Sequence, residues 1–141
     1  MKANELMVGN IVRYDGMTVY IDQINKTKIE GMIDKNDLLI DIRFRVELLE
    51  PIPITEELLL KNGFKHEYDC ICEYTYYIRE IDDYFVEVKI GCSNMGDEYI
   101  NCHIDNCDRN SVANADIRYL HQLQNLLNIV GVKMKWKVYH K

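Results

Sequence analysis

The chain has 141 residues, of which 48% are hydrophobic and 28% charged, and its formal net charge is -6 at pH 7. This composition supports a buried core and excludes a largely disordered chain. The acidic balance argues against a protein that grips phosphate backbones, because that binding depends on Lys and Arg neutralising phosphates. No apolar run approaches the ~20 residues of a membrane span, and the first residues lack a secretory signal. We therefore expect a cytoplasmic protein without membrane association, whose 5 cysteines stay reduced.

The first fifty residues have the pattern of short strands separated by polar turns. Apolar and polar residues alternate over 11–14 and 17–24, and Asp15-Gly16 between them is a hairpin-turn signal. Strand-like segments follow at 29–33, 38–42 and 44–49. Four or five short strands predict a small SH3-like β-barrel, or a bent sheet, over residues 1–50.

Both prolines of the chain, Pro51 and Pro53, stand one residue apart after this region. Their fixed φ angles and missing donors interrupt a sheet, so we place the boundary between two lobes here and assign residues 51–141 to the second. Thr55 is the expected N-cap of a short helix over 55–62, which Gly63 ends.

The second lobe is predicted to be α+β, which makes the whole chain α+β. Period-two alternation over about residues 71–104 predicts three antiparallel strands, with a turn at Asp82-Asp83 and a polar loop over 105–114. A main helix is expected over 115–130, with Asn114 as its N-cap and Gly131 as its stop. Alternating apolar residues then predict a final strand over 132–139.

Three segments together resemble a family of small proteins of unknown function from Bacteroides-type gut bacteria, their phages and mobile elements. The segments are Lys2-Ala3-Asn4-Glu5-Leu6 with Val8-Gly9-Asn10, residues 49–57 leading to Leu60-Lys61-Asn62-Gly63-Phe64, and Tyr119-Leu120-His121-Gln122-Leu123-Gln124-Asn125-Leu126. The resemblance spans nearly the whole chain in outline. Where the family carries aromatic residues, this chain has Leu58 and Leu127. The resemblance implies a mobile-element setting, cytoplasmic residence and a role in phage or host interplay, and it implies no activity.

Cysteine and histidine supply weak candidates for a metal or catalytic site. Cys102, His103 and Cys107 form a sequence cluster that could hold a metal if the loop folded back, with Cys92 or His66 as the fourth ligand. The alternative is that these are buried thiols, which free cysteines commonly are. We expect no bound cofactor and favour this alternative.

Cys70 and Cys72 are one residue apart, which is closer than the spacing of structural zinc knuckles. Nucleophilic catalysis would instead pair Cys107 with His103 or His121, oriented by Asp105 or Asp108. This catalytic interpretation is the weaker one, because no catalytic motif accompanies it.

Two polar surfaces are the better candidates for binding. The predicted main helix carries His121, Gln122, Gln124 and Asn125 on its polar side. They could form a hydrogen-bonding surface for a partner, or they could satisfy backbone groups inside the fold, which is the interpretation we favour.

The second surface is rich in tyrosine. Tyr74 and Tyr76, with Tyr77, Tyr84 and Tyr99 nearby in the predicted sheet, suit a protein interface or a half-exposed strand.

Three functions follow as hypotheses. The leading one is a non-catalytic protein-interaction or regulatory module of a mobile element or phage, with a protein partner or self-association. The second is a nucleic-acid-associated accessory protein that uses the SH3-like lobe and Lys133, Lys135, Lys137 and Lys141, against which the net acidity counts. The third is a small metal-binding protein or enzyme built on the Cys/His cluster.

Overall fold

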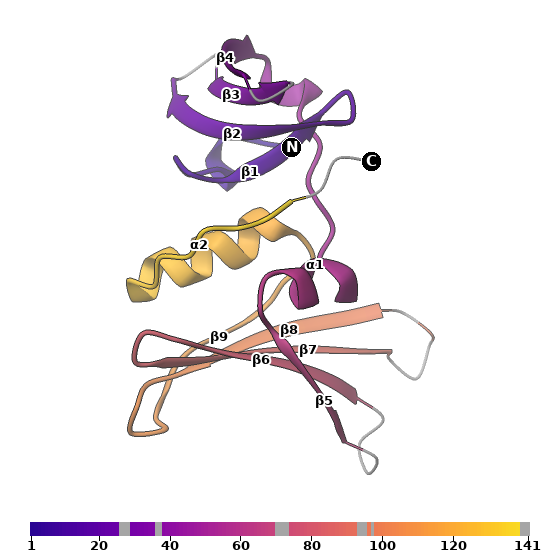
Figure 1. The fold of residues 1–141 in the computed structure, drawn as a ribbon, viewed down its shortest axis with the longest axis vertical. Helices are drawn as coiled ribbons and strands as arrows, with labels where there is room; N and C mark the ends of the chain where they lie inside the picture. The colour runs from indigo at the N-terminus through magenta and orange to yellow at the C-terminus, as the bar shows by residue number, and fades with distance from the viewer. Residues whose placement is uncertain (26–28, 36–37, 70–73, 93–95, 97, 139–141) are drawn as a thin grey trace. The chain divides into compact units, whose positions relative to one another are not determined.

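The computed structural model describes all residues except 26–28, 36–37, 70–73, 93–95, 97 and 139–141. The chain is α+β, with two antiparallel sheets (Figure 1). Its contacts divide it into two compact units. Unit 1 comprises Met1–Pro53, Tyr119–Asn125 and Val138–Lys141, and unit 2 comprises Ile54–Arg118 and Leu126–Lys137. Unit 1 thus includes two segments from far along the chain, which a split at residue 50 does not contain.

Unit 1 is built on a four-stranded meander whose strands form as the alternation predicts. The strands are β1 (Ile11–Tyr14), β2 (Met17–Ile24), β3 (Ile29–Lys35) and β4 (Leu38–Phe44), in the spatial order β1-β2-β3-β4. Asp15 and Gly16 make the first turn with φ 47° and 77°, the left-handed conformations that a tight hairpin requires. Among the described residues β1 does not pair with β4, so the barrel is not closed.

The core of unit 1 is aliphatic with one buried aromatic ring. It gathers side chains from all four strands, from Leu6 near the 3₁₀ helix η1 (Ala3–Glu5) and from Leu49 after the 3₁₀ helix η2 (Val46–Leu48). The η2 turn takes the place of the strand expected over 44–49. The cluster consists of Leu6, Val12, Val19, Ile21, Ile29, Ile33, Phe44 and Leu49.

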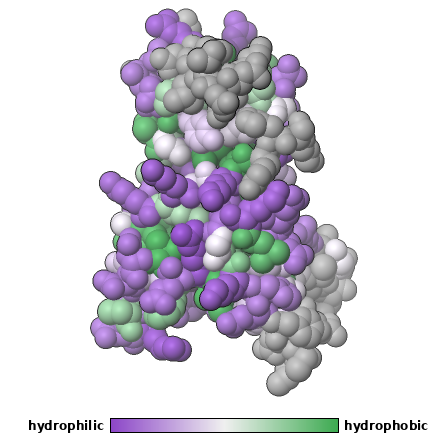
Figure 2. Space-filling model, viewed as in Figure 1, coloured by the Kyte–Doolittle hydropathy of each residue, from purple (hydrophilic) through white to green (hydrophobic). Residues whose placement is uncertain are grey.

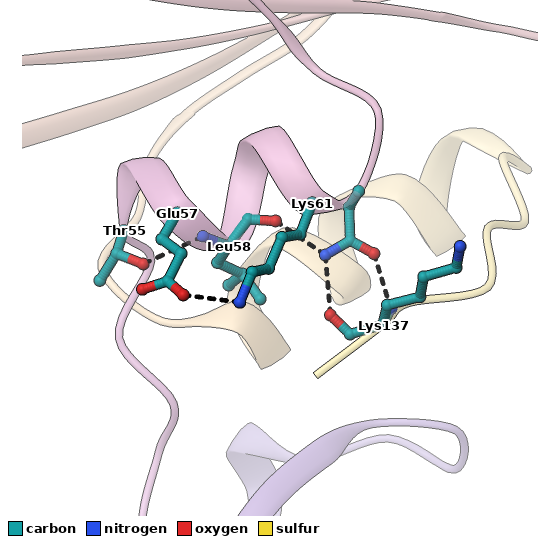
Figure 3. Close-up of polar contacts among 6 residues, drawn as sticks. Thr55, Glu57, Leu58, Lys61 and Lys137 are labelled. Carbon is teal, nitrogen blue, oxygen red and sulfur yellow. Dashed lines mark hydrogen bonds and ion pairs between the residues drawn. The ribbon is translucent and has the colours of Figure 1, made fainter. Parts of the chain in front are cut away.

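Unit 2 begins with the short helix α1 (Glu56–Lys61), which confirms the prediction for this segment. The Thr55 side chain accepts a hydrogen bond from the Leu58 amide at 3.2 Å, as an N-cap does (Figure 3). Gly63, with φ 81°, ends the helix, and the amides of Gly63 and Phe64 return to carbonyls of the last turn. Lys61 pairs with Glu57 one turn back at 2.6 Å.

The second sheet has five strands in sequential order, and all are antiparallel. They are β5 (Lys65–Asp69), β6 (Tyr74–Ile81), β7 (Tyr84–Cys92), β8 (Glu98–Asp105) and β9 (Ser111–Asp116). The three predicted strands are confirmed as β6, β7 and β8, with the hairpin turn at Asp82, where φ is 52°. The polar loop predicted over 105–114 is wrong in part. Its second half pairs with β8 and supplies the edge strand β9.

The main helix α2 (Leu120–Val130) is shorter than predicted. Residues 115 and 116 belong to β9, so Asn114 is not an N-cap. The helix instead begins after Tyr119, whose amide donates to the Gln122 side chain at 3.1 Å, the reciprocal contact of a capping box. Gly131, with φ 84°, ends it as predicted. Within the described parts of the chain, the helices are too short or too polar to cross a bilayer.

The final strand predicted over 132–139 is wrong for the residues that the structure describes, since 132–138 form no strand. The alternation is nevertheless real, because Val132 and Trp136 are buried while the lysines between and after them are exposed. The partner of this segment is a side chain: Asn62 donates to the Lys137 carbonyl at 2.9 Å and accepts from the Lys137 amide at 2.6 Å. The Asn62 amide pairs with both backbone groups of one residue, as a peptide group of a neighbouring strand would. A strand requires such pairs at successive residues, and a single side chain cannot provide them.

Candidate functional site

The polar side of α2 is used inside unit 1. Gln124, only 7% exposed, accepts a hydrogen bond from the Ile11 amide at 2.9 Å and donates to the Gly9 carbonyl at 3.2 Å. β1 is the outermost strand of its sheet, and on its outer side Glu50 pairs with Arg13 but not with Ile11. Gln124 therefore satisfies backbone groups at and just before this edge, a structural use that makes it unavailable to a partner.

Asn125, the next residue of α2, also bonds groups near the start of the chain. Its side chain accepts from Asn10 at 2.8 Å and donates to the Glu5 carbonyl at 3.0 Å. Asn10 is fully buried, and its own oxygen accepts from the Met7 amide. We call Asn10, Gln124 and Asn125 the amide cluster. Its hydrogen-bonding groups are largely paired within the unit.

His121 and Gln122, the other two candidates on this helix, differ from each other. Gln122 is exposed and caps the start of α2. His121 is 2% exposed and stacks on Tyr119, with ring centroids 5.9 Å apart. Burial lowers the pKa of His121, against an opposing contribution from Glu5. Its Nδ1 has no hydrogen-bond partner among the described residues. A neutral, buried imidazole of this kind belongs to the packing of unit 1.

Cys102 and His103, the first two members of the Cys/His cluster, occupy adjacent positions on β8. Cys102 is fully buried on β8, and neighbouring residues on a strand point to opposite faces, so His103 lies on the other face. Burial raises the pKa of Cys102 to about 12, with Glu87 adding to the effect, which keeps the thiol protonated. In the part of the chain that the structure describes, no three Cys, His, Asp or Glu side chains come together as metal ligands.

The remaining members of that cluster have other positions. His103 Nε2 lies 2.8 Å from the Asp105 carboxylate, and Cys107 is an exposed free thiol in the turn before β9. Cys70 and Cys72 lie outside the described residues.

The five-stranded sheet offers a different surface, which we call the outer face. One row across the strands consists of Glu67, Tyr76, Lys89, Asn101 and Asp116, which are successive cross-strand partners. The next row consists of Lys65, Ile78, Glu87, His103 and Asn114. Alternation sends the intervening residues, such as Val88 and Cys102, to the buried inner face. Tyr74 and Tyr76, the two tyrosines predicted to bind, both belong to the outer face.

Helix α1 packs on the opposite, inner face of this sheet. Arg79, an inner-face residue of β6, donates to the Asn62 carbonyl at the end of α1. The hydroxyl of Tyr77, also on the inner face, pairs with Glu56, and burial together with this carboxylate raises the pKa of Tyr77. In Figure 1, α1 lies on one side of the sheet. Among the described residues of unit 2, no helix covers the outer face.

Gly91 organises an aromatic part of the outer face. A Cβ at this position would meet the Tyr74 ring at 2.3 Å, so only glycine lets the ring lie on the β7 backbone. Tyr99 is the cross-strand partner of Gly91 on the other side. The Lys89 ammonium lies 4.3 Å from the centroid of Tyr74 and 5.6 Å from that of Tyr99, within reach of cation–π attraction.

A polar network continues across β8 and β9. Asn101 donates to Asn114 at 2.7 Å and to Asp116 at 3.0 Å. Asp116 also pairs with the Tyr99 hydroxyl and raises its pKa, although partial burial is the larger cause. These contacts are exposed, and they fix side-chain positions on a surface that water reaches.

The sequence pointed to the tyrosines but not to the rest of this face. Gly91, Glu87 and Asn101 come to share this face with Tyr74 and Tyr76 only through the strand register, which period-two alternation alone does not determine. A glycine inside a strand pattern was the one available signal, since it marks a close approach to the backbone.

Comparison with known proteins adds no relative. No protein-family model, curated protein or solved structure matches this chain.

Proposed function

We propose that this chain is a non-catalytic protein-interaction module that binds a protein partner through the outer face of its second sheet. The observation that supports this proposal most directly is a half-exposed sheet face that carries Tyr74, Tyr76 and Tyr99 beside fixed polar groups. Tyrosine is enriched at protein interfaces because it combines a wide apolar surface with a polar tip. The amide cluster, by contrast, is used within unit 1.

The setting that we propose is cytoplasmic, in a bacterial mobile element or phage of the kind that the resemblance implies. We also propose that unit 1 is an SH3-like sheet that has not closed into a barrel. The support is its four-stranded meander with tight turns. Fold likeness of this kind does not determine activity, so the partner has to be sought through the outer face.

Site-specific crosslinking would test the proposed function. A photo-crosslinking amino acid replaces Tyr76 in one variant of the full chain and Leu48, a 53% exposed residue of unit 1, in a control variant. Both are expressed in the native host, and crosslinked species are identified by mass spectrometry. We expect a discrete protein adduct from position 76 and none from position 48.

The candidate partner is then purified and its affinity measured for the wild type and for Tyr76→Ala. We expect at least a tenfold loss, which is typical of an interface tyrosine. Equal adducts at both positions, or binding unchanged by Tyr76→Ala, would contradict the use of this face.

A further inference from the structure

We infer that the partner of the outer face is a basic protein segment, and that one of its Arg or Lys side chains pairs with Glu87. This inference rests on the proposed function of the same face and adds the chemistry of the partner. Glu87 lies on the central strand β7, between Ile78 on one neighbouring strand and His103 on the other.

Glu87 is a half-buried carboxylate whose neighbouring cations among the described residues contact other groups. Lys89 is its neighbour two residues along the same face, but the Lys89 ammonium lies over the rings of Tyr74 and Tyr99. The His103 imidazole lies against Asp105. Among the described residues Glu87 makes no ion pair, so a guanidinium or ammonium from a partner would find an unpaired acceptor near the middle of the face.

The charge of the face favours the same partner. The described side chains of the outer face, with the loop residue Arg109 over the Phe85 ring, include five carboxylates and three permanent cations. The carboxylates are Glu67, Glu80, Glu87, Asp105 and Asp116, and the cations are Lys65, Lys89 and Arg109. The whole chain carries a formal charge of -6. Complementary charge speeds association and selects partners, so a basic segment is favoured over an acidic one or a second copy of this chain.

Lys89 shows that the tyrosines of this face accept a cation. Its ammonium lies over two rings, and no carboxylate of the described residues forms an ion pair with it. The planar guanidinium of an arginine can stack on an aromatic ring and also pair with a carboxylate. On the same face, the ring of Phe85, two residues from Glu87, already has a guanidinium near it, since that of Arg109 lies 5.7 Å from the ring centroid. A partner arginine would therefore pair with the Glu87 carboxylate on a face that also carries aromatic rings.

The test uses ¹⁵N-labelled full chain and synthetic peptides as probes. A ten-residue peptide of alternating Arg and Ser is titrated in low salt, with a peptide of alternating Glu and Ser as its control. We expect chemical-shift changes concentrated on β6, β7 and β8 with the arginine peptide only. Binding should weaken as salt is raised, because ion pairs at a surface are screened.

Two charge-neutral variants make the test specific. Glu87→Gln removes one charge and keeps the shape, and we expect about tenfold weaker binding, the size of one charge-assisted hydrogen-bonded pair. Glu67→Gln removes the same charge from the edge strand β5, and we expect less than a twofold change. The ¹⁵N spectrum of each variant also shows whether its fold is retained.

Three results would overturn the inference. They are equal losses in both variants, shift changes spread over the acids of both units, and equal binding of the glutamate peptide. The proposed function would survive these results if the position-76 adduct contained a neutral or acidic partner segment. It would itself be contradicted if position 76 gave no adduct.

Discussion

The amide cluster of unit 1 and the polar network of the outer face contain the same kinds of side chain. In the first region they pair with groups inside the fold, and in the second they lie at the surface. Gln124 and Asn10 are buried, and their partners include backbone amides of the same unit. Asn101 makes as many hydrogen bonds, but with exposed side chains. The number of hydrogen bonds therefore does not separate a structural amide from a surface one. Burial and the identity of the partner do, because an unpaired buried backbone group is costly.

Removal of the Gln124 side chain should have the largest effect on stability. In Gln124→Ala the buried Ile11 amide and the Gly9 carbonyl lose their partners, and we expect unfolding to become about 2–4 kcal/mol easier. Urea denaturation followed by circular dichroism would measure the change. Asn128→Ala is the control, since Asn128 is exposed on the same helix, and we expect a change within about 0.5 kcal/mol. Similar losses in both variants would mean that Gln124 acts only through the helix.

Asn62→Ala should lower the free energy of unfolding by about 2–3 kcal/mol, because the Asn62 side chain pairs with both backbone groups of Lys137. Lys137→Ala is a matched control that keeps the same backbone groups, and we expect it to be nearly neutral. The same denaturation experiment compares the two. If Lys137→Ala were as damaging as Asn62→Ala, the lysine side chain would have to contribute to this contact.

His121 should make a smaller contribution to stability, and this contribution depends on pH. Its pKa is lowered in the folded chain, so between that value and the unfolded value of 6.5 the unfolded chain binds more protons. Its contribution to stability is complete above about pH 6.5 and is lost as the pH falls below it. Urea midpoints at pH 7.5 and 5.5 should therefore differ less in His121→Leu than in the wild type. An equal difference in both proteins would assign the pH dependence to other groups.

Asn101→Ala should have the smallest effect on stability, about 0.5–1 kcal/mol or less, because water can replace its exposed contacts with Asn114 and Asp116. Affinity for the partner captured at position 76 should fall instead. Calorimetric unfolding and titration of the same variant measure the two quantities. A loss of stability as large as that of Asn62→Ala would remove the distinction between the two polar regions.

The sequence predicted the structure correctly where the pattern of apolar residues and the turn or cap residues indicated the same element. The hairpin at Asp15-Gly16, the capped helix after Thr55 and the stop at Gly131 all depend on local backbone preferences. The edge strand β9 was missed because Ser111–Asp116 consists mostly of small and polar residues, and its pairing with β8 holds it in place. The start of α2 was misplaced for the same reason.

The candidate site could be predicted only in part. Tyr74 and Tyr76 share a face by alternation, which a sequence shows directly. Glu87 and Asn101 depend on register across three strands, which only the assembled sheet reveals. On α2 the favoured interpretation, that amides satisfy internal backbone groups, agrees with the contacts of Gln124 and Asn125, but the backbone groups that they bond lie more than 100 residues away.

That separation has a consequence for synthesis on the ribosome. Ile11 and Gln124 are 113 residues apart, and Glu5 and Asn125 are 120 apart. Gln124 follows Phe44, the last residue of the first sheet, by about 80 residues, so at translation rates of roughly 5–20 residues per second this sheet would emerge roughly 4–16 s before the helix that completes its edge. During that interval the β1 edge of the nascent chain lacks the Gln124 side chain. We expect the interval to be the time at which this protein most needs chaperone protection against strand pairing between chains.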